Sequence, residues 1–272
     1  MNRRDFVSSS SAALAVAGIG LPAVPQRIDR IGIQLYTVRK LFMAEPEKTL
    51  AALRKIGYKE VEFAGYPTKS ALETRAMLKK AGLAAPSAHI DLGAIRERWQ
   101  ATLDFAREVG HRYLIVAWLD EADRKTLKDY RRVADLLTKA ADEAAKSEIE
   151  VGYHNHDFEF DAPEGYKPYD VLLRNTSSSV VFEMDLYWIT KAGGGPLDFF
   201  TRFTGRFPLV HVKDMGKDRS MVDVGSGTID FKRIFAQRKL AGIKHYFVEH
   251  DDPADPLGFA KRSYDYLDQL TF

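Results

Sequence analysis

Histidine and carboxylate side chains gather at four places along the sequence, each at the end of a run of apolar residues. They are Tyr153-His154-Asn155-His156, Glu183-Met184-Asp185, His211-Val212-Lys213-Asp214 and Glu249-His250. The chain has no cysteine, so any metal must be held by His, Asp or Glu. Imidazole and carboxylate ligands without sulfur suit Mn²⁺, Zn²⁺, Co²⁺ or Mg²⁺, and the histidines make Mg²⁺ the least favoured of these. The residue types therefore predict a divalent metal site.

Eight short β-branched or aromatic runs would have to position these residues. The stretches between the runs have apolar residues three and four positions apart, as in Leu50-Leu53-Ile56, and several end at a glycine, namely Gly57, Gly82, Gly110 and Gly242. This alternation is typical of parallel βαβ units. No Gly-x-Gly-x-x-Gly turn follows the first run and no Gly/Ser-rich linker divides the chain, which favours one α/β domain, a closed (β/α)8 barrel, over a doubly wound sheet. The runs are 31–38, 60–64, 85–90, 113–118, 149–154, 180–186, 209–213 and 246–250.

The active site of such a barrel lies at the carboxyl ends of the strands, where these residues stand. Side chains alternate along a strand, so His154 and His156 share one face, as do Glu183 and Asp185. With Asp185 pointing inward at the rim, side chains from neighbouring strands converge on it. The predicted metal ligands are His154, Asp185, His211 and Glu249.

Four segments of the chain resemble a known family, the xylose isomerase-like TIM barrels of the sugar phosphate isomerases and epimerases. The segments are Phe182-Glu-Met-Asp185, Val210-His-Val-Lys-Asp214, Val224-Gly-Ser-Gly-Thr-Ile-Asp-Phe231 and Phe247-Val-Glu249. The resemblance covers essentially all of the chain after its first residues. It implies a divalent metal, often Mn²⁺, that binds two neighbouring oxygens of a sugar or polyol. Asp185, His211 and Glu249 match the metal ligands of the family.

The chain departs from the epimerases that it resembles at two positions. Those enzymes have a glutamate on strand five, paired as acid and base with the glutamate of strand eight. This chain has His154 there, followed closely by His156 and Glu159, and it has Trp188 where the epimerases have a substrate-binding histidine. His154 is therefore predicted as a fourth ligand.

The remaining polar and aromatic residues at the strand ends receive roles as follows. His156, whose ordinary pKa lies near operating pH, or Glu249 is the predicted base, and Lys213 orients or protonates a substrate oxygen. Glu62 and His89 are predicted to contact sugar hydroxyls, with a supporting or helix-capping role as the alternative. Trp118 and Trp188 are predicted to stack on the sugar, with simple packing as the alternative.

These roles suit removal of a proton beside a carbonyl group, with the metal stabilising the enolate charge. The first interpretation is a metal-dependent sugar isomerase or epimerase. The alternative is a lyase or hydrolase that cleaves 3-keto-glycosides by β-elimination. A third interpretation is a carbohydrate-binding barrel without catalysis. In each case the partner is a small-molecule sugar or glycoside.

The composition and the first residues of the chain restrict its binding partners and its cellular location. The formal net charge is only +2 over 272 residues and the basic residues form no stripe, which gives no indication of nucleic-acid binding. Residues 1–27 have a charged start, an apolar middle and a small-residue exit, with Arg3-Arg4 and Phe6 resembling a twin-arginine export signal. The apolar part has roughly 12 residues, fewer than the roughly 20 that span a bilayer. We expect cleavage, a barrel domain over 28–272, a periplasmic location and no stable membrane insertion. The oligomeric state stays open, a homo-oligomer included.

Overall fold

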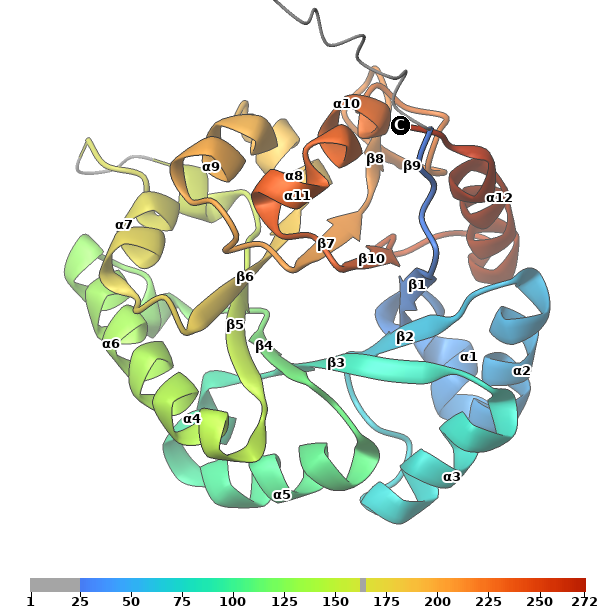
Figure 1. The fold of residues 1–272 in the computed structure, drawn as a ribbon, viewed down its shortest axis with the longest axis horizontal. Coiled ribbons are helices and arrows are strands. Elements are labelled where there is room, and N and C mark those ends of the chain that lie inside the picture. The colour runs from blue at the N-terminus through green and yellow to red at the C-terminus, as the bar shows by residue number, and fades with distance from the viewer. Residues whose placement is uncertain (1–24, 162–164) are drawn as a thin grey trace, which may run out of the picture.

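The computed structural model describes residues 25–161 and 165–272. Eight parallel strands close into a barrel in the order β1-β10-β7-β6-β5-β4-β3-β2, with helices around it (Figure 1). Each predicted run overlaps one barrel strand, so the prediction of a single (β/α)8 barrel is confirmed. The strands are β1 (Ile31–Gln34), β2 (Glu60–Phe63), β3 (Ala84–Ile90), β4 (Tyr113–Val116), β5 (Glu150–His154), β6 (Val180–Asp185), β7 (Leu209–Val212) and β10 (His245–Val248).

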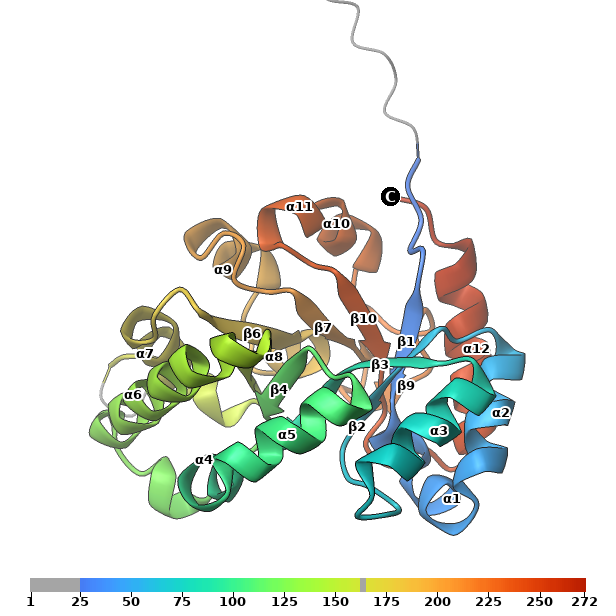
Figure 2. The same cartoon turned by 60° about the horizontal axis from the view of Figure 1, so that its bottom comes forward.

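The helices lie outside the barrel and cover its outer face (Figures 1 and 2). They are α1 (Arg39–Ala44), α2 (Pro46–Ile56), α3 (Ala71–Ala81), α4 (Leu92–Glu97), α5 (Trp99–Val109), α6 (Leu127–Ala144), α7 (Pro168–Asn175), α8 (Leu186–Lys191), α9 (Pro196–Arg202), α10 (Phe231–Ala236), α11 (Arg238–Ala241) and α12 (Pro256–Gln269). A small hairpin, β8 (Asp214–Met215) with β9 (Met221–Val222), follows β7. Among the helices of the described part of the chain, none combines the length and apolar character needed to cross a bilayer.

Local signals in the sequence set where the helices begin and end. Helix α3 starts where the Ser70 side chain accepts the N–H of Glu73, and it ends at Gly82, whose φ of 69° suits glycine. Helix α6 begins with a capping box between Thr126 and Asp129. The predicted glycine stops are confirmed, because each of the four follows the last residue of a helix.

The interior of the barrel is layered. Near the middle, inward side chains form a small apolar cluster separate from the main core between strands and helices: Tyr113, Ile115, Val181, Leu209 and Phe247. Glycines make room for it, since a Cβ on Gly32 would lie 2.6 Å from the Phe247 ring and one on Gly152 would lie 2.6 Å from Ile115 Cδ1. Two residues further along the chain from Gly152, Val181, Leu209 and Phe247, the inward positions are polar. The apolar cluster is therefore the floor of a polar layer at the carboxyl ends of the strands.

Six of the predicted strands end one to four residues earlier than expected, among them the first and the last. The first ends at Gln34 rather than residue 38, because the Gln34 side chain accepts the N–H of Tyr36 and residues Leu35–Val38 turn into the 3-10 helix η1. The last ends at Val248 rather than residue 250. Both endings leave the following polar residues on connections at the rim.

The two ends of the described chain lie side by side (Figure 2). The backbone groups of Gln26 and Phe272 exchange two hydrogen bonds of 2.8 and 3.0 Å. The predicted export signal, up to residue 24, lies outside the described residues.

Candidate metal centre

A buried cluster of charged side chains fills the carboxyl end of the barrel. The register of the strands explains why these side chains lie close together, since Asp185 pairs with His211 and Glu183 pairs with His154 in neighbouring strands. Four carboxylates face one ammonium group and three imidazoles, and all but the His89 side chain are essentially inaccessible to solvent. The members are Glu62, His89, His154, Glu183, Asp185, His211, Lys213 and Glu249. This excess of negative charge favours a bound cation.

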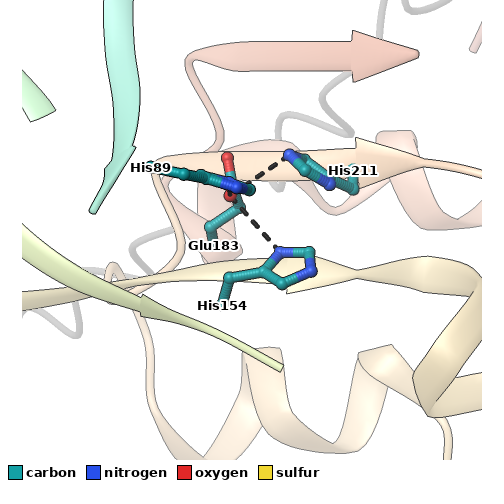
Figure 3. Close-up of side chains that lie close together, drawn as sticks. All are labelled: His89, His154, Glu183 and His211. Atoms are coloured by element: carbon teal, nitrogen blue, oxygen red, sulfur yellow. Dashed lines mark hydrogen bonds and ion pairs between the residues drawn. The ribbon is translucent and has the colours of Figure 1, made fainter. Parts of the chain in front are cut away.

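The cluster contains two overlapping sets of residues that could hold a metal ion. The inner set is His89, His154, Glu183 and His211, drawn in Figure 3, and the outer set is Asp185, His211 and Glu249. Within each set the ligand atoms lie within 4.8 Å of one another. His211 belongs to both because its two ring nitrogens face opposite ways. Its Nδ1 lies 2.7 Å from Glu249 Oε2, and its Nε2 lies 2.6 Å from Glu62 Oε2.

The outer set, extended by His154, corresponds to the four predicted ligands, and the structure brings all four together. His154 Nε2 lies 3.8 Å from Asp185 Oδ2, and His211 Nδ1 lies 3.9 Å from the same oxygen. Asp185 Oδ2 is buried and accepts no hydrogen bond from the described residues. A buried carboxylate oxygen between two imidazoles and a second carboxylate is the donor arrangement that a divalent cation takes. The cluster is thus consistent with a divalent metal site.

Glu183 and Glu62 lie on the opposite side of these imidazoles. Glu183 Oε2 is 2.8 Å from His89 Nε2, 3.3 Å from His154 Nδ1 and 3.2 Å from His211 Nε2 (Figure 3). Carboxylates in this position orient metal-binding histidines and fix which nitrogen carries the proton. Glu183 has no role in the sequence-based assignment, although its alternation with Asp185 indicated that it would face inward.

Glu62 and His89 were expected to contact sugar hydroxyls. Glu62 is completely buried and engaged by protein groups: the side chains of Gln34 and Ser87 donate to it at 2.7 and 2.5 Å. These contacts favour the supporting role that the sequence left as an alternative. The His89 side chain is 13% exposed, so one side of its ring remains accessible from the rim.

Burial and mutual charge interactions shift the pKa values of the cluster. Burial would lower the pKa of His89, but Glu62 and Glu183 outweigh it and raise that pKa to about 9. Burial raises the pKa of Asp185 to about 6, against the effect of Lys213 and His211. The pKa of Glu249 falls below its ordinary value, because Lys213 and His211 outweigh burial. Glu249 is therefore ionised at neutral pH.

Lys213 is the one lysine of the cluster and is 2% exposed. Its Nζ lies 2.8 Å from Glu249 Oε2, 3.1 Å from Asp185 Oδ2 and 2.8 Å from Asp251 Oδ1. Although burial opposes the charge, these carboxylates raise the pKa of Lys213 well above its ordinary value. Lys213 therefore carries a protonated ammonium group beside the predicted ligands.

The aromatic rings of the rim surround His156. Strand β5 ends at His154, and the Asn155 side chain turns toward strand β6, where it accepts the N–H of Asp185 at 3.0 Å. The His156 ring lies 5.0 Å from that of His154, 5.1 Å from that of Trp118 and 5.6 Å from that of Trp188. Burial lowers the pKa of His156 to about 3, with Lys213 adding to the effect. The expectation that His156 keeps an ordinary pKa is therefore not met, and its ring is neutral.

Glu159, the next carboxylate after His156, lies outside the metal-ligand sets. It accepts the hydroxyl of Tyr153 at 2.5 Å and the backbone N–H of His156 at 2.8 Å, and burial raises its pKa to about 8. Its contacts fix the loop that carries His156.

Polar atoms without partners are concentrated at this site. In the described residues, nine buried side-chain polar atoms have no hydrogen-bond partner, and five of them belong to His154, His156, Glu183, Asp185 and Trp188. Buried polar atoms normally find partners. Such a concentration is consistent with a site for a metal ion.

Comparisons with known proteins agree with this geometry. Residues 50–269 match the family described as xylose isomerase-like TIM barrel. A sugar phosphate isomerase/epimerase from Parabacteroides distasonis is 27% identical, with a TM-score of 0.77, over 89% of this chain and 98% of its own. A second one from that organism is 24% identical, with a TM-score of 0.78, over 94% and 96%. No curated protein sequence matches significantly.

A more distant structure shares the fold alone. The D-allulose 3-epimerase from Methylomonas sp. is 15% identical with a TM-score of 0.66, over 90% of this chain and 99% of its own. The family match covers most of the barrel, from helix α2 to helix α12. On these grounds the chain belongs to the xylose isomerase-like TIM barrel family.

Proposed function

We propose that this protein is a metal-dependent sugar isomerase or epimerase that removes a proton from a carbon beside a carbonyl group. The observation that carries the proposal is the convergence of His154, Asp185, His211 and Glu249. Among them, Asp185 Oδ2 accepts no hydrogen bond from the described part of the chain and forms an ion pair with the Lys213 ammonium. The structural neighbours named as sugar isomerases and epimerases support the same class of substrate.

His154, Asp185, His211 and Glu249 would hold the divalent cation, for which we propose Mn²⁺. A cation bound there supplies Lewis acidity, which stabilises the negative charge that develops on a sugar oxygen. Elemental analysis of the purified protein tests the identity of the metal.

Glu249 is the proposed base and Lys213 the proposed acid. Glu249 is ionised, so its carboxylate can take the proton from the carbon while the electron pair of the C–H bond moves to the carbonyl oxygen. Lys213 donates a hydrogen bond, and then a proton, to a substrate oxygen. Return of the proton to the opposite face of the same carbon gives an epimer, and return to the adjacent carbon gives an isomer. The rings of Trp118 and Trp188 can stack on the sugar.

A second candidate is cleavage of a 3-keto-glycoside by β-elimination. It is favoured by the residue on strand β5, where an imidazole replaces the carboxylate that would face Glu249 as an acid/base partner. The next carboxylate, Glu159, is held by Tyr153 and a backbone N–H. Elimination needs only one base for the carbon and one acid for the leaving oxygen, and Glu249 and Lys213 suffice.

Solvent deuterium separates these candidates. The metal-loaded protein is incubated in deuterated water with free ketoses and with 3-keto-glycosides. Deuterium in an otherwise unchanged or isomerised sugar supports the first candidate, and release of the aglycone supports the second. Absence of both reactions across the panel would contradict enzymatic function and leave a carbohydrate-binding barrel.

We further propose that the protein is exported to the periplasm by a twin-arginine signal in residues 1–27. The support is the Arg3-Arg4 pair, the short apolar segment after it and the absence of cysteine. Replacing Arg3 and Arg4 with lysine should retain the full-length precursor in the cytoplasm. Unchanged export of that variant would contradict this signal.

A further inference from the structure

A large cleft lies beside the buried cluster, at the carboxyl ends of β1 to β4. It has a volume of about 1090 Å³ and runs along the connections that follow β2 and β3 to helix α5. Tyr36, His89, Tyr66, Trp118 and Ala101 are among its lining residues. The residues assigned to chemistry above, apart from His89 and Trp118, lie outside this lining.

The cleft is continuous with the metal centre at His89 and Trp118. His89 Nε2 lies 2.8 Å from Glu183 Oε2, so its ring forms both the edge of the cluster and the wall of the cleft. On the other side, Trp118 contacts His156 at 5.1 Å between ring centroids, and His156 contacts His154 at 5.0 Å. A sugar placed over the predicted ligands would therefore have one edge at the mouth of the cleft.

The volume of the cleft exceeds what one sugar ring requires. Pockets that enclose whole drug-sized ligands, which contain several rings, typically measure roughly 300–1,000 Å³. The cleft reaches that size without including the space directly over Asp185 and Glu249. It can therefore hold a group attached to the reacting sugar.

The lining indicates the chemistry of that group. Tyr36 is 40% exposed and Trp118 is 49% exposed, which is unusual for large aromatic side chains of this protein, and Tyr66 and Phe105 add two more rings. Aromatic faces of this kind stack on flat rings. The charge of Arg98 is matched by Asp91, whose Oδ2 accepts its Nη2 at 2.8 Å, and Lys69 lies at the exposed edge. The walls suit an uncharged ring better than a phosphate.

We propose that this cleft is a binding subsite for a second ring, so that the substrate is a two-ring glycoside rather than a free monosaccharide. The proposal rests on the proposed function in one respect, namely that the reacting sugar lies over the metal centre. The second ring is either another sugar or an aromatic aglycone, since both present a flat face to the aromatic walls.

Binding of unreactive glycosides tests the subsite without any turnover. The metal-loaded full chain is titrated calorimetrically with methyl glucoside, phenyl glucoside and cellobiose, and with the α-anomers methyl α-glucoside, phenyl α-glucoside and maltose. At least one two-ring compound should bind tenfold or more tightly than the methyl glucoside of the same anomer. Tighter binding of the phenyl compound indicates an aromatic aglycone, and tighter binding of the disaccharide indicates a second sugar.

Ala101→Trp places a large ring in the cleft from helix α5, at an exposed position away from the metal centre. It should reduce the affinity for the two-ring compounds tenfold or more and leave that for methyl glucoside unchanged. Gln100→Trp is the matched control, because Gln100 is exposed on the same helix but does not line the cleft. Trp118→Ala provides a second variant, which should also remove the preference for two rings. Circular dichroism confirms that each variant is folded.

Equal affinities for one-ring and two-ring compounds, no binding by any two-ring compound, or equal effects of Ala101→Trp and Gln100→Trp would overturn the subsite. These outcomes are separate from failure of the proposed function. Deuterium exchange into free ketoses without a two-ring preference would reject only the subsite. A two-ring preference that Ala101→Trp abolishes, without any exchange or cleavage, would support the subsite and reject the proposed chemistry.

Discussion

A histidine contacts a glutamate at both ends of the barrel, but the charged groups around the two pairs differ. At the amino ends of the strands, His245 Nδ1 lies 2.7 Å from Glu60 Oε2, and Arg30 Nε lies 2.9 Å from the other oxygen of Glu60. At the carboxyl ends, His211 Nδ1 lies 2.7 Å from Glu249 Oε2, the same separation. The apolar layer in the middle of the barrel separates the two pairs.

The surroundings of the two pairs decide what each can do. Glu60 is matched by His245 and by Arg30, whose side chain is 57% exposed, so this carboxylate is already neutralised without a ligand. At the other end, four carboxylates face three groups whose raised pKa values favour the cation, Lys213, His89 and His211, so negative charge still exceeds positive charge. A histidine–carboxylate contact is therefore no indication of a metal site by itself. The excess of converging carboxylates is the informative feature, and it agrees with the general placement of barrel active sites.

The largest effect is expected from the predicted ligands. Asp185→Ala and His211→Ala should each abolish stoichiometric binding of Mn²⁺, because each removes a donor from a set that has few replacements. Both variants should remain folded, since Asp185 and His211 lie in the polar layer beyond the apolar cluster of the barrel interior. Calorimetric titration with Mn²⁺ and circular dichroism measure the two properties. Full metal affinity in either variant would contradict the proposed coordination.

Lys213→Met should reduce turnover by about 10²–10⁴-fold, the usual contribution of a general acid or base. Metal affinity should stay the same or rise, because the ammonium group lies within 3.1 Å of Asp185 and Glu249 and repels a second cation. Steady-state kinetics and Mn²⁺ titration separate the two effects. A variant that loses metal affinity and turnover together would assign Lys213 a purely structural role.

Glu183→Gln distinguishes the two overlapping ligand sets. If Glu183 orients the imidazoles from behind, the variant should lose about 10–100-fold in metal affinity, as is usual for such supporting groups. Glu159→Gln is the control, because Glu159 is a buried carboxylate nearby that belongs to neither set. Complete loss of binding in Glu183→Gln, with Asp185→Ala still binding, would place the cation in the inner set.

His156→Asn should lower turnover less than about tenfold. The His156 ring packs against the rings of Trp118, Phe158 and Trp188, whereas Glu249 belongs to the ligand set itself. Metal affinity should be unchanged. A loss of 10²-fold or more at constant metal content would identify His156 as the base instead of Glu249.

Most of the fold could be predicted from the sequence, because strands buried on both faces appear as short apolar runs between amphipathic helices. The residues at which the strands end were harder to predict from the sequence. Residues 35–38 continue the apolar pattern, yet the Gln34 side chain accepts the N–H of Tyr36 and the chain turns. Nothing in an apolar pattern records that competing hydrogen bond.

The alternation of side chains along a strand predicted which residues of the site face inward. It did not predict which side chains contact one another across the barrel. Asp185 and Glu183 were expected on the same face, and both are buried in the cluster. Glu183 precedes Asp185 by two residues on β6 and contacts His89 of β3, a strand that is not its neighbour in the barrel, and a single sequence does not show that contact. His156 was expected to follow His154 on one strand face, but strand β5 ends at His154.

The smallest effect is expected at the amino end, where His245→Ala is the counterpart of His211→Ala. Both variants remove an imidazole that lies 2.7 Å from a glutamate. At Glu60, however, Arg30 remains as a partner, so the free energy of unfolding should fall by only about 1–2 kcal/mol, in the range of a lost hydrogen bond to a charged group. Metal affinity and turnover should be unchanged, which urea denaturation, Mn²⁺ titration and kinetics can verify together. Should His245→Ala weaken metal binding as strongly as His211→Ala, the two ends of the barrel would be coupled, and an excess of carboxylates at one end would not be what defines the site.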